Sequence, residues 1–413
     1  MTQENASTIP ESDAAVGWLD RRCRSAVLSR FDRLEGGRLT IADPDGEWAI
    51  GRSGPLDATI CVHSGSFWRM LATGGSVGAG EAYMAGLWDA VDLVGVVRLL
   101  AANRRTMDRM EQGSARLYGW ALRGAHRLAR NTLGGARRNI AAHYDLGNEF
   151  FESWLDPRMQ YSSALFTDDD QTLESAQERK LLRIADRLAL SPDDHLLEIG
   201  TGWGGLAVFM AERFGCRVTT TTISEQQYRY ALDAVGKAGL DDRVSVLKQD
   251  YRELEGRFDK VVSVEMIEAV GADFLDRYLA TIRDRLRPDG LALIQAITIE
   301  DYRYATALGS VDYIKRYIFP GSFIPSVSAI TSAMARSTDL ALIELFDFGE
   351  SYARTLRCWR ERFETAWQDI RSNAFDETFR RRWRFYLAYC EGGFRERAIS
   401  DVHLLLAAPE YRK

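Results

Sequence analysis

The chain has 413 residues, of which 46% are hydrophobic and 27% are charged, and its formal net charge is −6. This length suits two soluble domains, and the negative charge argues against general nucleic-acid binding. No stretch of about 18 apolar residues predicts a transmembrane helix, and the polar start "MTQENASTIPESDAA" lacks the pattern of a secretory signal. Five scattered cysteines and five dispersed histidines favour a cytoplasmic protein without a metal site.

The first part of the chain predicts a disordered tail and a small domain. Residues 1–15 are polar and acidic, and we expect them to be disordered. From Arg38 to Ser64 the sequence alternates like β-strands, with Asp-Gly and Ser-Gly turns. The segment "GGSVGAG" predicts a glycine-rich turn, after which a helical pattern continues through Leu100. Residues 16–103 are therefore expected to form a small α+β domain.

A basic segment, residues 104–140, follows this domain. Nine arginines lie between Arg104 and Arg138, against only Asp108 and Glu111. Because leucines and Trp120 are interleaved with the arginines, the segment can lie on an anionic membrane surface. A solvated linker helix with a charge bias explains the same composition, and the residues alone leave both interpretations open.

Residues 141–413 show alternating strands and helices, which predicts an α/β fold with a doubly wound, mostly parallel sheet. Helical patterns cover Leu206–Phe214, Glu225–Ala238 and Phe274–Leu286, and Thr355–Arg397 predicts a largely helical tail. The segment Asp401–Ala408 is expected to be a closing edge strand. The other predicted strands are His195–Ile199, Arg217–Thr222, Val244–Lys248, Lys260–Glu265, Leu291–Ala296 and Ala341–Phe346.

A glycine-rich loop follows the first of these strands in "HLLEIGTGWGG". Gly200, Gly202 and Gly205 satisfy the GxGxxG pattern of dinucleotide sites, and Gly204 adds to the turn. The pattern alone is weak, since a glycine turn without a ligand has the same letters. Glu198, two residues before the loop, places a carboxylate where a positive ligand group fits better than a pyrophosphate.

Polar residues at the next two strand ends also favour a ligand other than a dinucleotide. The second strand ends in Thr222 and Ser224, and Gln227 follows, so hydroxyl and amide groups are available for a ribose. Asp250 and Tyr251 end the third strand and suit the edge and face of an adenine. Together with Glu198, this pattern matches S-adenosylmethionine and favours a methyltransferase over a dehydrogenase.

Longer motifs resemble the family of cyclopropane-fatty-acyl-phospholipid synthases and mycolic acid cyclopropane synthases. They include "HYDLGNEFFESWLDPRMQYSSALF", "EIGTGWGGLA", "VEMIEAVG", "YIKRYIFPGSFIPS" and "FYLAYCEGGFRER". The resemblance extends from about Ala141 to Ile399 and implies a class I, Rossmann-like methyltransferase domain. "GEAYMAGLWDAVDL" resembles the N-terminal domain of the phospholipid-acting members, which implies a lipid-associated role for residues 16–103.

The resemblance implies transfer of a methyl group from S-adenosylmethionine to the cis double bond of an unsaturated acyl chain. By motif position, Tyr161 and Ser162 would cover the cofactor, and Gly200 and Gly202 would lie beneath its methionine part. Thr222 and Gln227 would contact the ribose, and Tyr251 would lie by the adenine. The product is a cyclopropane or a methyl- or methylene-branched chain, and the sequence leaves these outcomes open.

Relatives are thought to hold a bicarbonate as the base that removes a proton from the added methyl group. The resemblance places Glu268, Tyr352 and the backbone of Ile297 at this anion. Ser163 stands where the family has a cysteine and Gln295 where it has a histidine, so bicarbonate binding is open. Glu265 is expected to be a strand-end residue with a local hydrogen bond, outside the site.

The leading interpretation is a peripheral enzyme at the inner face of the membrane, acting on unsaturated phospholipids. A homodimer is left open, and no nucleic-acid partner is expected. A methyltransferase acting on a soluble small molecule is the second interpretation. A catalytically silent lipid-binding protein is the third, prompted by the altered residues Ser163 and Gln295.

Overall fold

The computed structural model describes residues 16–31, 34–105, 146–168, 172–372 and 374–412. The predicted disordered tail and the basic segment beyond Arg105 lie outside the described residues. The chain forms two compact units, of which the first comprises the described part of residues 1–118 together with Glu377–Phe385. The second comprises the described part of residues 119–376 and 386–413. The domain limits given above stay predictions.

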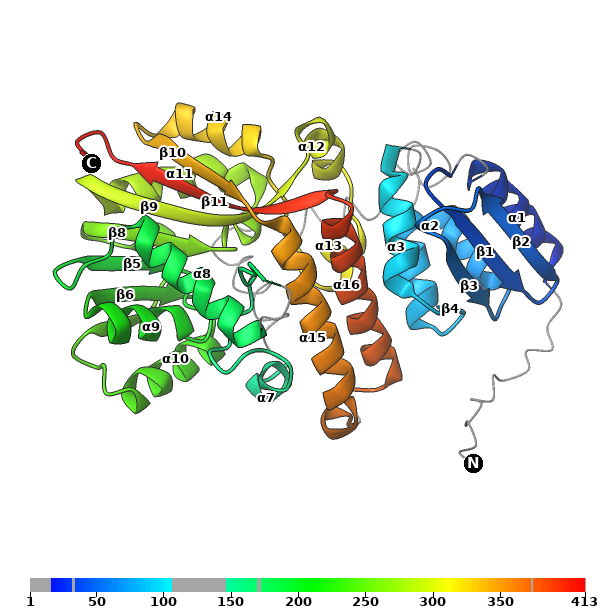
Figure 1. The fold of residues 1–413 in the computed structure, drawn as a ribbon, viewed down its shortest axis with the longest axis horizontal. Helices are drawn as coiled ribbons and strands as arrows, with labels where there is room; N and C mark the ends of the chain where they lie inside the picture. Colours follow the sequence, from blue (N-terminus) through cyan, green and yellow to red (C-terminus); the bar gives the residue numbers. More distant parts are fainter. Residues whose placement is uncertain (1–15, 32–33, 106–145, 169–171, 373, 413) are drawn as a thin grey trace. The chain divides into compact units, whose positions relative to one another are not determined.

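The first unit contains a four-stranded sheet and three helices that precede the basic segment. The sheet order is β2-β1-β3-β4, and β1 pairs antiparallel with β2 and parallel with β3. The predicted strands of this region are confirmed. The strands are β1 (Arg38–Asp43), β2 (Gly46–Gly51), β3 (Ala58–Val62) and β4 (Trp88–Ala90), and the helices are α1 (Trp18–Phe31), α2 (Ser66–Met84) and α3 (Leu93–Ala102) (Figure 1).

The sequence predicted that the glycine-rich segment of this unit forms a turn before a helix. The segment instead lies within α2. Two helical segments meet at Gly75, whose backbone has φ 54° and ψ −133°. A Cβ atom at Gly78 would lie 2.0 Å from the carbonyl oxygen of Met70. The glycines therefore allow a kink and a close backbone approach, which a local sequence pattern reads as a turn.

The second unit is built on a seven-stranded sheet in the order β10-β11-β9-β8-β5-β6-β7. Strands β5 to β9 are mutually parallel, and β11 is antiparallel to both β9 and β10. This confirms the predicted α/β class and every predicted strand. The strands are β5 (His195–Ile199), β6 (Arg217–Thr222), β7 (Val244–Lys248), β8 (Phe258–Val264), β9 (Leu286–Ile299), β10 (Ala341–Asp347) and β11 (Ile399–Ala407).

The predicted edge position of β11 was wrong. This strand lies between β9 and β10, and its residues from Asp401 to Ala407 are all buried. The edge is β10, whose alternating exposure leaves Ile343 and Leu345 open to solvent. A nearly continuous apolar run such as "VHLLLAA" is typical of a strand that is covered on both faces.

Helices cover both faces of this sheet, as the alternating pattern predicted (Figure 1). One face packs against α8 (Leu173–Arg187), α9 (Gly205–Phe214) and α10 (Glu225–Lys237). The other face packs against α11 (Leu275–Arg285) and α14 (Val327–Ser337). The remaining α-helices of the described chain are α7 (Asn148–Glu152), α12 (Asp301–Leu308), α13 (Tyr313–Tyr317), α15 (Gly349–Ile370) and α16 (Glu377–Arg395).

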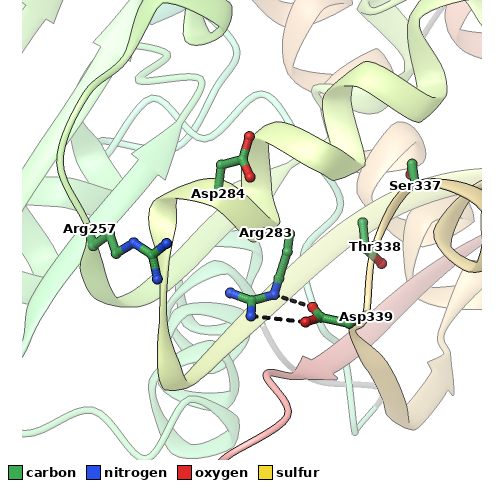
Figure 2. Close-up of a pocket in the computed structure, with 6 residues that line it drawn as sticks. All are labelled: Arg257, Arg283, Asp284, Ser337, Thr338 and Asp339. Carbon is green, nitrogen blue, oxygen red and sulfur yellow. Dashed lines mark hydrogen bonds and ion pairs between the residues drawn. The ribbon is translucent and has the colours of Figure 1, made fainter.

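A surface pocket lies at the amino end of β9, where α11 ends (Figure 2). Its lining residues are Arg257, Arg283, Asp284, Ser337, Thr338 and Asp339, and Arg283 forms an ion pair with Asp339. The glycine loop and the predicted catalytic residues lie instead toward the carboxyl ends of the parallel strands. This pocket is therefore separate from the candidate site. Among the described helices, none combines the length and apolar character needed to span a membrane.

Candidate active site

The glycine loop turns sharply between β5 and α9. Gly200, Gly202 and Gly204 have positive φ angles of 101°, 51° and 90°, a region that side-chain-bearing residues rarely adopt. No atom lies within 4 Å of the position that a Cβ of Gly202 would take, so the backbone there is open to a ligand. At Gly205 a Cβ would lie 2.1 Å from the carbonyl oxygen of Arg158. The backbone of the loop is therefore closely packed at Gly205 and open to a ligand at Gly202.

Glu198 lies just before this loop, buried in β5. Its carboxylate accepts a 2.6 Å hydrogen bond from the hydroxyl of Thr220, its neighbour on β6. Burial raises the pKa of Glu198 to about 8, although the Thr220 hydrogen bond and the charge of Lys180 oppose this shift. A positive ligand group nearby would favour the ionised carboxylate. The residue therefore fits the cationic cofactor predicted from the sequence.

The end of β6 contacts the loop through the carbonyl of Thr221, and β7 is the next strand of the sheet. The hydroxyl of Thr222 donates to Oε1 of Gln227 at 2.9 Å, and Ser224 caps α10 by accepting from the backbone N–H of Gln227. Asp250 accepts hydrogen bonds from the backbone and guanidinium of Arg252, and the buried ring of Tyr251 adjoins them. The carboxylate of Asp250 is thus bound to Arg252, and its contact with an adenine stays a prediction.

Tyr161 and Ser162 belong to a segment that is held in place by hydrogen bonds from a lysine of α8. Lys180, which is fully buried, donates to Oγ of Ser162 at 2.7 Å and to Oε1 of Gln160 at 3.0 Å. Burial lowers the pKa of Lys180 to about 8, although surrounding carboxylates, Glu265 foremost, oppose this shift. The ring of Tyr161 lies 5.3 Å from that of Trp359, centroid to centroid. A buried cation therefore supports the segment predicted to cover the cofactor.

The carboxylate of Glu265 is the centre of the polar contacts at the end of β8. Its Oε1 accepts from the backbone N–H of Ser163 at 2.7 Å and from Nε2 of Gln295 at 2.8 Å, and its Oε2 accepts from the hydroxyl of Tyr352 at 2.7 Å. These partners are 102, 30 and 87 residues away in the sequence. The expectation of a merely local hydrogen bond was therefore wrong. Three residues predicted to hold an external anion converge on a protein carboxylate.

Glu268 lies one turn further on, in the short 3₁₀ helix η2 (Ile267–Ala269). Its Oε1 accepts from the backbone N–H of Ile297 at 2.5 Å. Its Oε2 is buried and has no hydrogen-bond partner among the described residues. Burial, and next the nearby charge of Glu265, raise the pKa of Glu268 to about 8. The two glutamates thus form a half-buried acidic pair in different surroundings.

Gln295 connects this pair to two residues of β11. Its Nε2 also donates to Oδ2 of Asp401 at 2.9 Å, and its Oε1 lies 3.0 Å from Nε2 of His403. Burial lowers the pKa of His403 to about 3, so the imidazole is neutral and its Nε2–H donates to the amide oxygen. Burial also raises the pKa of Asp401 well above its ordinary value. The amide of Gln295 thus makes hydrogen bonds to three side chains at once.

Sequence reasoning missed Lys180, Asp401 and His403 and set Glu265 aside. Asp401 and His403 interrupt an otherwise apolar strand, and ionisable residues within such a run are unusual. That interruption is the signal that could have identified them. No comparable signal marks the partners of Lys180, because they come from a separate segment of the chain.

Known proteins with similar sequences identify the family. The family profile of mycolic acid cyclopropane synthetase matches residues 132–404. A tuberculostearic acid methyltransferase of Mycobacterium tuberculosis is 38% identical over 370 residues, which cover 86% of this chain and 84% of that protein. A cyclopropane-fatty-acyl-phospholipid synthase of Escherichia coli is 36% identical over 372 residues, which cover 87% of this chain and 93% of that protein.

Solved structures agree with the fold. The mycolic acid cyclopropane synthase CmaA1, solved in complex with SAH and CTAB, superposes with a TM-score of 0.60 at 26% identity. The superposition covers 66% of this chain and 98% of that one. The family profile spans more than half of the chain, and the two sequence relatives align over most of it. The chain therefore belongs to the mycolic acid cyclopropane synthetase family of S-adenosylmethionine-dependent methyltransferases.

Proposed function

We propose that the protein transfers a methyl carbon from S-adenosylmethionine to the double bond of an unsaturated acyl chain in a membrane phospholipid. The observation that carries this proposal is the half-buried acidic pair Glu265 and Glu268 beside the glycine loop. A Cβ placed on Gly200 would lie 3.5 Å from the side chain of Met266, so the end of β8 adjoins the loop. Carboxylates in this position suit a reaction that creates positive charge and then removes a proton.

The reaction requires a close and dry site, because an alkene is a weak nucleophile. Its π electrons form a bond to the sulfonium methyl carbon, and the carbon–sulfur electron pair stays on sulfur. The other alkene carbon becomes a cation. Loss of a proton from the added methyl group then lets the C–H electrons close a cyclopropane ring. If a hydride first shifts to the cationic carbon, the same proton loss leaves a methylene branch.

Aromatic side chains around the acidic pair support the cationic step. The ring of Tyr352 stacks on Phe394, with centroids 4.4 Å apart, and meets Trp359 edge-on at 6.0 Å. The ring of Tyr161 lies 5.3 Å from that of Trp359 and 6.3 Å from that of Phe319, centroid to centroid. Aromatic faces attract a cation and exclude water, which would otherwise capture it.

The residues near the glycine loop supply the groups that the cofactor needs. S-adenosylmethionine supplies the activated methyl group. Its methionine part would lie over Gly200, Gly202 and Gly204, near the carboxylate of Glu198. Tyr161 and Ser162 would cover it. The ribose would be held by Thr222, Ser224 and Gln227, and the adenine by Asp250 and Tyr251.

The phospholipid substrate is supported by the extent of the sequence match. The Escherichia coli relative, named for its phospholipid substrate, aligns over 87% of this chain, which exceeds the methyltransferase domain alone. We therefore assign a lipid-associated role to residues 16–103 and membrane contact to the basic segment 104–140, at the inner face of the membrane. The extra domain argues against a soluble small-molecule substrate, and the retained cofactor residues argue against a silent lipid-binding protein.

Expression in a bacterial host that makes unsaturated phospholipids, but has no cyclopropane synthase of its own, tests the proposal. Mass spectrometry of the fatty acids should show chains heavier by one CH₂ group. Derivatisation of double bonds then separates a ring from a methylene branch. If no heavier acyl chain forms while the purified protein binds S-adenosylmethionine, the substrate assignment fails.

A further inference from the structure

We propose that Glu265 is the base that removes the proton from the added methyl group, in place of an external bicarbonate. The inference rests on the proposed function and deepens it. The sequence analysis gave the role of base or anion anchor to Glu268. The contacts of the two carboxylates point instead to Glu265 as the base and to Glu268 as its protonated neighbour.

The first argument is that the groups expected to bind bicarbonate already bind protein carboxylates. The backbone N–H of Ser163, the amide of Gln295 and the hydroxyl of Tyr352 all donate to Glu265. The backbone N–H of Ile297 donates to Glu268. A bicarbonate ion would have to displace these carboxylates and bring further negative charge beside them. Buried like charges are unfavourable, so the arrangement disfavours an added anion.

The second argument is the difference between the two glutamates. Glu265 accepts three hydrogen bonds, whereas Glu268 accepts one and has a buried oxygen without a partner among the described residues. Burial raises the pKa of Glu265, but its three hydrogen bonds and the charge of Lys180 oppose this shift, and hydrogen bonds to a carboxylate favour its ionised form. Two carboxyl groups this close do not readily ionise together. Glu265 is therefore the carboxylate, and Glu268 holds the proton.

The third argument is the backbone at Glu265. Its φ angle is +47°, a left-handed conformation that glutamate seldom adopts. The conformation occurs directly after β8 and directs the side chain to partners on three distant segments. Unfavourable backbone geometry that is held by long-range contacts is typical of functional sites.

The proton transfer is balanced without another reactant. A carboxylate oxygen of Glu265 takes the proton from the added methyl group, and the C–H electron pair becomes the new carbon–carbon bond or π bond. Glu265 is then neutral, and it returns its proton to solvent when the product leaves. Gln295 cannot carry this proton, because an amide does not ionise at neutral pH. Its role is to orient the carboxylate.

The first test measures turnover of purified protein with vesicles of unsaturated phosphatidylethanolamine and phosphatidylglycerol, in buffer freed of carbon dioxide. We expect the same rate, within about twofold, when bicarbonate is restored. A rate that falls severalfold on removal of bicarbonate would overturn the inference.

The second test compares two isosteric variants and a control. Loss of a general base reduces rates by about 10²- to 10⁴-fold, so Glu265→Gln should lose at least about 100-fold in kcat with little change in cofactor affinity. Glu268→Gln should lose much less, since an amide resembles a protonated carboxyl. The exposed Glu255 provides a control, Glu255→Gln, with unchanged turnover. If Glu268→Gln is the more severe change, Glu268 is the base and our assignment is wrong.

The third test uses Glu265→Gly, a substitution that suits the positive φ and empties the space of the carboxylate. Added bicarbonate or formate should restore turnover to this variant but not raise that of the unchanged protein. Crystals of both proteins soaked in bicarbonate give a result that does not depend on turnover. We expect an anion between Ser163 and Tyr352 in the variant only. An anion there in the unchanged protein would refute the inference even if no lipid product forms, whereas a missing product alone would refute the proposed function.

Discussion

The hydroxyl of Tyr352 allows a precise test of the acidic pair, because Tyr352→Phe removes one hydrogen bond and leaves the ring contacts. The ring is 6% exposed and stacks on Phe394, and its hydroxyl donates to Glu265 at 2.7 Å. A hydrogen bond to a charged group contributes about 1.5–3 kcal/mol. We therefore expect the free energy of unfolding to fall by about 2 kcal/mol at pH 8.

The pH dependence of this loss has a defined sign. Burial raises the pKa of Glu265 above its ordinary value of 4.5, and the Tyr352 hydrogen bond partly opposes this shift. The folded protein therefore binds more protons than the unfolded chain above pH 4.5, and its stability decreases as pH rises through the folded pKa. Without the hydroxyl the folded pKa should rise further, because one of the groups that stabilise the ionised form is lost.

Urea denaturation of the unchanged protein and of Tyr352→Phe, followed by tryptophan fluorescence at pH 5 and pH 8, measures the loss of unfolding free energy at each pH. The loss should be smaller at pH 5 than at pH 8, because burial raises the pKa of Glu265 and its protonation gives the Tyr352 hydroxyl a neutral partner instead of a charged one. In turnover, the acidic limb of the pH–rate profile should move to higher pH. Tyr302→Phe, at an exposed ring, is the control and should change stability by less than about 0.5 kcal/mol. An equal loss at both pH values, with an unmoved profile, would refute the reasoning.

Three further substitutions test other parts of the site. Gln295→His should destabilise the protein by about 2–3 kcal/mol in urea denaturation, because an imidazole cannot satisfy Glu265, Asp401 and His403 together; unchanged stability would contradict this network. Ser163→Cys should keep turnover within about threefold, since the backbone N–H rather than the side chain contacts Glu265; a loss comparable to that of a missing hydrogen bond, about 10-fold, would show that the hydroxyl matters. Glu198→Gln should weaken binding of S-adenosylmethionine by about 10- to 100-fold in calorimetry, the equivalent of a charged hydrogen bond, and an unchanged affinity would remove Glu198 from the cofactor site.

The sequence by itself determined the alternating architecture and the position of the glycine loop. Strands β5, β6 and β7 begin and end where the pattern predicted, because each is a short run rich in aliphatic or β-branched residues between turn or helix signals. The glycines from Gly200 to Gly205 were recognisable for a similar reason: a sharp turn after a strand needs residues that tolerate positive φ. These features depend on local conformational preference, which a linear pattern records.

Only the tertiary structure decided which carboxylate the polar groups surround. Glu265 and Glu268 are three residues apart and look equivalent in sequence, but Glu265 accepts from Ser163, Gln295 and Tyr352, each on a distant segment. Sequence cannot give this choice, because it depends on the left-handed backbone at Glu265 and on the packing of three elements. The interior position of β11 brings Asp401 and His403 to Gln295. This position also depends on tertiary structure, because it requires pairing between strands that are about 100 residues apart. His403 and Gln295, for example, are 108 residues apart.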